Sequence, residues 1–158
     1  MPTINRSRRK YLQWLCGSAG LAMLPVARGH HTDTHFDEKS THQIVYQCNK
    51  ADPEYFEHIL FSVGELIRKY GDDVHVVVAC FGKGIHLVGK KPGRPVPKLL
   101  QQRAASLAQY GVTFHACGNT MKGLKWTKDD LLPFAKMVPI GVEEIMLLQE
   151  QGYSYFSW

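Results

Sequence analysis

Short continuous apolar runs alternate with longer stretches of helical periodicity from residue 43 to the last residue. The runs at 43–48, 74–80 and 112–117 predict strands, and shorter runs at 138–139 and 153–158 predict two more. Strands that alternate with helices in this way form βαβ units. We therefore expect an α/β fold with a mainly parallel sheet of about five strands and helices on both faces.

The helical stretches between these runs have recognisable ends. Asp52 and Pro53 form a typical helix start, and Gly71 lies where a glycine commonly ends a helix. Thr127 and Asp130 have the spacing of a capping box, which predicts a further helix start. The remaining predicted elements are helices over 99–107 and 142–148 and a loop rich in Gly, Lys and Pro over 81–96.

The first 29 residues follow a different pattern. A basic segment that contains Arg8 and Arg9 precedes an apolar run over 12–26. Residues 27–29, which include small residues, follow as a plausible cleavage region. This is the layout of a signal peptide, and the run is too short and glycine-rich for a membrane span of roughly 20 residues. The pair Arg8-Arg9 predicts export to the periplasm through the twin-arginine pathway. A Sec-type signal with a chance arginine pair is the alternative.

The net charge of +5 comes from this leader. The leader holds five basic residues and no acidic one, whereas the rest of the chain has fourteen of each. A nucleic-acid-binding surface needs its positive charge on the folded domain. We therefore expect no nucleic-acid partner.

Residues 30–42 are polar and lack an apolar period, which predicts a tether between the leader and a domain over 43–158. Histidine-rich segments sometimes bind zinc or copper, so a weak periplasmic metal binder is an alternative function. No cofactor is expected. The tether residues with metal-ligand chemistry are His30, His31, His35, His42, Asp33 and Asp37.

Three cysteines follow the leader, and each ends a predicted strand: Cys48, Cys80 and Cys117. Ligands of open parallel sheets bind outside these strand ends, so we expect all three thiols along one edge of the sheet. An odd number of cysteines leaves at least one thiol without a disulfide partner within the chain, and a disulfide between Cys48 and Cys117 is an alternative that the sequence leaves open. We interpret Cys48 and Cys80 as buried small hydrophobes and keep them as candidate second thiols.

Cys117 has the surroundings of a reactive thiol. Gly118 and Asn119 follow it in a turn-like segment that can present backbone N–H groups to a thiolate. His115 lies two residues earlier, on the same strand face. Because N–H donors and positive charge lower a thiol pKa, we predict Cys117 as the catalytic residue, supported by Gly118, Asn119 and His115. A structural role for His115 is the alternative.

The segment 114–121 around Cys117 resembles the cysteine motif of the DsrE/DsrF-like family, and residues 138–145 and 148–153 resemble its C-terminal segment. The resemblance extends from about residue 43 to the last residue. It implies a flavodoxin-like three-layer fold, homotrimers or homohexamers, and sulfur handling in which a cysteine carries sulfur as a persulfide. That role falls on Cys117.

We therefore expect a sulfur carrier or sulfurtransferase-like protein that accepts sulfane sulfur on Cys117 in the periplasm. The expected partners are copies of the chain itself and a sulfur donor or acceptor, either a protein or a small sulfane compound. The relay members of the family are cytoplasmic whereas the leader predicts export, so donor and acceptor are left open. A non-catalytic oligomeric binding module of the same fold is the alternative.

Overall fold

The structure, a computed structural model, describes residues 40–158. The predicted signal peptide and most of the predicted tether lie outside the described residues. Within residues 40–158, no helix combines the length and apolar character needed to cross a bilayer. The strands are β1 (His42–Cys48), β2 (Val74–Cys80), β3 (Thr113–Cys117), β4 (Ala135–Val138) and β5 (Ser154–Phe156), and the α-helices are α1 (Pro53–Tyr70), α2 (Lys98–Gln109), α3 (Gly118–Gly123) and α4 (Gly141–Glu150).

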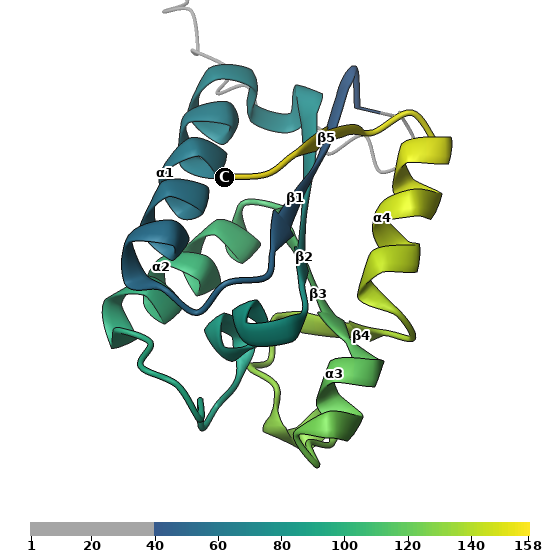
Figure 1. Ribbon diagram of the computed structural model, residues 1–158. Helices are drawn as coiled ribbons and strands as arrows, with labels where there is room; N and C mark the ends of the chain where they lie inside the picture. The colour runs from purple at the N-terminus through teal and green to yellow at the C-terminus, as the bar shows by residue number, and fades with distance from the viewer. Residues whose placement is uncertain (1–39) are drawn as a thin grey trace, which may run out of the picture. The chain divides into compact units, whose positions relative to one another are not determined.

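The five strands form one all-parallel sheet in the order β4-β3-β2-β1-β5. Helices α1 and α2 cover one face of this sheet, and α4 covers the other (Figure 1). The short helix α3 follows β3 directly at the carboxyl end of that strand, and its Met121 packs in the larger core. The predicted α/β fold with a parallel sheet and helices on both faces is confirmed.

Alternate residues of each strand pack on opposite faces of the sheet. Val78 and Phe114 belong to the larger core, beneath α1 and α2. Val77 points to the other side and packs with Ile145 and Leu148 of α4. Because helices cover both faces of β2, its sequence is a nearly continuous apolar run.

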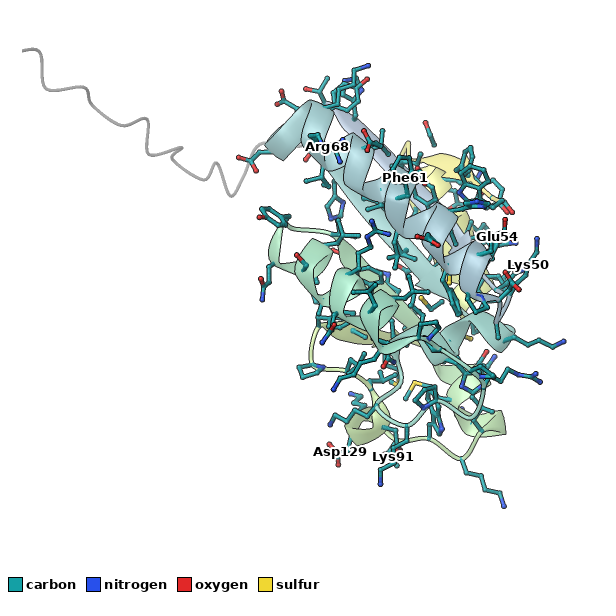
Figure 2. All side chains as sticks on the ribbon, turned by 90° about the vertical axis from the view of Figure 1, so that its left-hand side faces the viewer. Lys50, Glu54, Phe61, Arg68, Lys91 and Asp129 are labelled. Carbon is teal, nitrogen blue, oxygen red and sulfur yellow. The ribbon has the colours of Figure 1, made fainter. Side chains whose placement is uncertain are left out.

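Helix α1 begins and ends as its sequence predicts. The Asp52 side chain accepts a 2.9 Å hydrogen bond from the N–H of Tyr55, and Gly71 ends the helix with a φ of 56°, where a side chain is strained. The apolar side of the helix packs on the sheet. Phe61 and Arg68 lie along its solvent-facing side, which Figure 2 shows from the front.

Two segments predicted as irregular are helical in the structure. The predicted loop over 81–96 begins with a 3-10 stretch, η2 (Gly82–Val88), most of which is buried against the sheet. The turn-like segment after Cys117 is the six-residue helix α3. Both segments have glycine-rich starts that resemble turns in sequence, so tertiary packing decided their conformation.

The capping box forms but does not start a helix of normal length. The N–H of Thr127 lies 2.7 Å from Oδ2 of Asp130, yet only the single 3-10 turn η3 (Lys128–Asp130) follows. The chain then leaves the helical path because the N–H of Leu132 donates a 2.8 Å hydrogen bond to the carbonyl of Val88 in η2. Strand β4 consequently starts at Ala135, earlier than the predicted 138–139.

Candidate functional site

Cys117 lies where β3 ends and α3 begins. It is the last residue of β3 and the N-cap of α3, and it contacts the start of α4 on the α4 side of the sheet. The residue is only 5% exposed, so it is largely enclosed by its neighbours. This burial limits direct access to small or slender reactants.

Four polar donors surround the Cys117 sulfur: the backbone N–H groups of Asn119, Thr120 and Gly141, and the Thr120 hydroxyl. Burial by itself raises the pKa of the Cys117 thiol, but the four donors together outweigh it and hold that pKa below its ordinary value. The Cys117 side chain makes no regular cap bond to α3, so these groups act on the sulfur as nearby N–H and O–H dipoles. The site therefore favours the thiolate.

Two helix starts meet at this sulfur. Asn119 and Thr120 belong to the first turn of α3, and Gly141 is the first residue of α4. The N–H groups of a first helical turn have no partner within the helix, and the partial positive charge there favours an anion. Asn119 shares its N–H, which also donates to the carbonyl of Pro139 at 3.2 Å.

Thr120 connects the sulfur to the segment that follows β2. Its Oγ1 accepts a 3.1 Å hydrogen bond from the N–H of Gly82, which leaves the hydroxyl proton for Cys117. Neither Thr120 nor Gly141 is among the site residues predicted from the sequence. Thr120 lies within the motif around Cys117, so its hydroxyl was a usable signal. Gly141 is distant in sequence, and only the fold brings it to the sulfur.

Two glycines permit this close packing. A Cβ at Gly141 would lie 3.0 Å from the Cβ of Cys117. A Cβ at Gly118 would lie 3.1 Å from the carbonyl oxygens of Val138 and Pro139. Gly118 therefore contributes its small size to this packing.

His115 lies on the same strand face as Cys117 and meets an acidic side chain. Its Nδ1 is 2.9 Å from Oε1 of Glu144 in the first turn of α4, without the alignment of a regular hydrogen bond. The two side chains are 15% and 20% exposed. Burial lowers the pKa of His115, Glu144 raises it and Lys136 lowers it again, which leaves this pKa below its ordinary value.

Cys48 and Cys80 lie on the opposite face of the sheet. They are direct partners in the register of β1 and β2, and both are fully buried in the core beneath α1 and α2. A hydrogen bond with Cys80, together with burial, raises the pKa of Cys48 well above its ordinary value. The three described cysteines are free, so no Cys48–Cys117 disulfide joins the faces. All three thiols lie at the same edge of the sheet, but Cys48 and Cys80 do not belong to the site around Cys117.

Among the described histidines, His42, His58, His75 and His86 have ring contacts with aromatic side chains. The rings of His42 and Tyr70 are tilted by 53° with centroids 4.5 Å apart, and Nδ1 of His75 is 2.6 Å from the Tyr153 hydroxyl. Residues 40–158 hold no group of three or more His, Cys, Asp or Glu side chains placed to bind a metal ion. The other tether histidines, His30, His31 and His35, lie outside the described residues.

The fold and this site define an α/β protein that holds a thiolate where two helices begin. The chain belongs to the DsrE/DsrF-like family, which it matches over residues 43–158. Membership implies a role in sulfur relay, and proteins of this family generally form oligomers.

Two solved structures have the same fold. MTH1491 from Methanobacterium thermoautotrophicum, a protein of unknown function, is 22% identical with a TM-score of 0.66, and the match covers 74% of this chain and 99% of that one. The YchN protein from E. coli is 17% identical with a TM-score of 0.55 and the same coverage. Comparison with curated proteins gave no match.

Proposed function

We propose that this protein carries sulfane sulfur on Cys117 as a persulfide. The observation that carries the proposal is the set of four donors around the Cys117 sulfur, which favours its ionised form. The thiolate is the nucleophile in thiol exchange chemistry, so this is the form that sulfur transfer requires. Membership of a family with a role in sulfur relay supports the same assignment.

The proposed transfer conserves charge and needs no oxidant. The Cys117 thiolate attacks the outer sulfur of a persulfide donor, a new S–S bond forms at Cys117, and the donor leaves as a thiolate. With thiosulfate as donor, the leaving group is sulfite. The terminal sulfur of the Cys117 persulfide carries the negative charge until an acceptor thiolate attacks it, takes that sulfur and releases the Cys117 thiolate.

The burial of Cys117 restricts the donor. Because the residue is 5% exposed, a bulky reactant cannot reach its sulfur directly. We therefore propose a small sulfane compound, such as thiosulfate or a low-molecular-weight persulfide, or a protein persulfide on an extended segment.

Sulfur loading tests the function directly. The reduced full chain is treated with thiosulfate or polysulfide and analysed by intact-protein and peptide mass spectrometry. We expect the Cys117 peptide to gain the mass of one sulfur atom and to lose it again on reduction. Cys117→Ser should gain nothing, whereas Cys80→Ala should load as the unchanged protein does. Absence of the adduct, or an equal adduct in Cys117→Ser, would overturn the proposal.

We also propose that the chain acts in the periplasm after twin-arginine export. The support is the leader layout around Arg8 and Arg9. Replacing both with lysine should retain the protein in the cytoplasm, as cell fractionation would report. Unchanged export of this double variant would contradict the route.

The proposed oligomer is a homotrimer or homohexamer. Helix α4 exposes apolar side chains that a partner copy would cover: Val142 is 61%, Met146 50% and Leu147 41% exposed. Native mass spectrometry should detect one of these two assemblies, and a stable monomer at micromolar concentration would contradict it.

A further inference from the structure

The first turn of α4 is held to β3 at two points. The N–H of Gly141 faces the sulfur of Cys117, and three residues later Oε1 of Glu144 lies 2.9 Å from Nδ1 of His115. His115 and Cys117 are two residues apart on one strand face, so they are spaced roughly 7 Å along the strand. The His115–Glu144 pair and the Cys117 thiol therefore both lie where the first turn of α4 packs against β3.

Charged or titratable groups face His115 from each element packed against it. Glu144 comes from α4, and Lys136 is the direct register partner of His115 in β4. His75 of β2 also acts on His115 and is 2.6 Å from the hydroxyl of Tyr153, which precedes β5. Among these neighbours, Glu144 alone has a carboxylate. Glu144 therefore supplies the negative charge of this cluster, and a protonated His115, 2.9 Å away, is its direct counter-charge.

We propose that His115 and Glu144 form a positioning pair whose net charge controls how readily Cys117 ionises. A protonated His115 neutralises Glu144. When His115 loses its proton, the Glu144 carboxylate remains as a negative charge in the same helical turn as Gly141, and a negative charge there opposes formation of the thiolate. If Cys117 carries sulfur as proposed, on which this consequence rests, the pair makes the rate of sulfur loading depend on pH.

The pair should be visible in the pH profile of Cys117 alkylation. For an isolated thiol well below its pKa, the rate falls about tenfold for each pH unit. In this protein, protonation of His115 on the acid side removes the opposing charge and preserves part of the thiolate. Because the pKa of His115 is lowered from the ordinary 6.5, we expect the fall to become shallower below pH 6.5, where His115 becomes protonated.

Two conservative variants separate the charge from the packing. Glu144→Gln retains the size of the side chain and removes its charge, so the Cys117 alkylation rate at neutral pH should rise roughly threefold. His115→Asn cannot be protonated in this range, so its rate should fall at about the full tenfold per pH unit. Glu143→Gln is the matched control, since Glu143 is a carboxylate in the same turn whose side chain is exposed to solvent.

The measurement is iodoacetamide labelling of the full chain, read at the Cys117 peptide by mass spectrometry. A pair with a purely structural role would lower the melting temperature without moving the profile. The proposal is overturned if the Glu144→Gln rate equals that of Glu143→Gln, or if the His115→Asn profile matches that of the unchanged protein.

Alkylation requires no sulfur donor, so this test is separate from the test of the carrier function. Failure of Cys117 to accept sulfur would contradict the carrier function and leave the pair intact. Unmoved alkylation profiles would contradict the pair and leave the carrier function intact.

Discussion

Cys117 and the Cys48–Cys80 pair lie at the same edge of one sheet, yet their thiols have opposite surroundings. Cys48 donates to the carbonyl of Gly84 at 3.8 Å, a contact that only the neutral thiol makes. Cys117 instead faces backbone N–H groups, which favour its thiolate. Burial raises the pKa of both thiols, so the difference lies in whether the sulfur donates or accepts hydrogen bonds.

One residue of strand register produces this difference. Cys48, Cys80 and Ala116 are aligned across β1, β2 and β3, and Cys117 is one position further along. A step of one residue turns a strand side chain to the other face of the sheet. On the α4 face, two helices begin at the strand end and direct the N–H groups of their first turns at the sulfur. The face, more than the strand end itself, therefore decides whether the surroundings of a thiol favour its ionised form.

The largest expected effect is the difference in alkylation rate between the two regions. In the native protein Cys117 should react at least about a hundredfold faster than Cys48 or Cys80, because those thiols are fully buried and react only after local opening. Peptide mass spectrometry after timed iodoacetamide labelling measures the ratio. The three rates should converge in concentrated urea. Similar rates in the native protein would remove the basis of the comparison.

Gly141→Ala should bring the two regions closer together in reactivity. The new Cβ would lie 3.0 Å from the Cβ of Cys117 and 3.1 Å from that of Phe81, so the start of α4 must shift away from the sulfur. We expect alkylation of Cys117 to slow about tenfold and the free energy of unfolding to fall by about 1–3 kcal/mol.

Gly123→Ala is the control for this variant, because a Cβ at Gly123 meets nothing within 4 Å. Its alkylation rate and stability should stay near those of the unchanged protein. An equal loss of reactivity in both variants would show that Gly141 has no special relation to Cys117.

Thr120→Val removes one donor from the sulfur and one acceptor from Gly82. The pKa of Cys117 should rise by about one unit, and alkylation at neutral pH should slow about threefold. Thr120→Ser retains the hydroxyl and should restore most of the rate. If valine and serine give the same rate, the hydroxyl does not stabilise the thiolate.

The smallest expected effect is on the pH dependence of stability, where the two regions have opposite signs. The pKa of Cys117 is lowered in the folded state, so its contribution is present above the ordinary pKa of 9.0 and is lost as pH falls through the folded-state pKa. The pKa of Cys48 is raised, so its contribution is present below 9.0 and is lost as pH rises through the folded-state pKa.

Urea unfolding at a series of pH values measures both contributions. The stability difference between the unchanged protein and Cys117→Ser should increase as pH rises toward 9.0, the ordinary pKa of a cysteine thiol. Cys48→Ala should lose less stability than the unchanged protein at higher pH. Parallel curves for all three proteins would contradict both pKa directions.

Capping residues in the sequence predicted the ends of a helix correctly where no long-range contact competes with them. Asp52 and Gly71 bound α1 as expected, because a cap and a C-terminal glycine act within one turn of backbone. The same kind of signal misled at Thr127 and Asp130, where the capping box forms but the hydrogen bond from Leu132 to η2 ends the turn. A long-range contact outweighed the local preference there.

The sequence by itself determined the alternation of strands and helices, the parallel sheet that follows from it, and the choice of Cys117 as the cysteine with polar neighbours. Only the tertiary structure decided that Gly141 and Glu144 lie beside that strand and that Cys48 faces the other way. Periodicity and caps act over a few residues, whereas register and helix placement arise from covering both faces of the sheet at once. Those contacts join segments that are distant in the sequence.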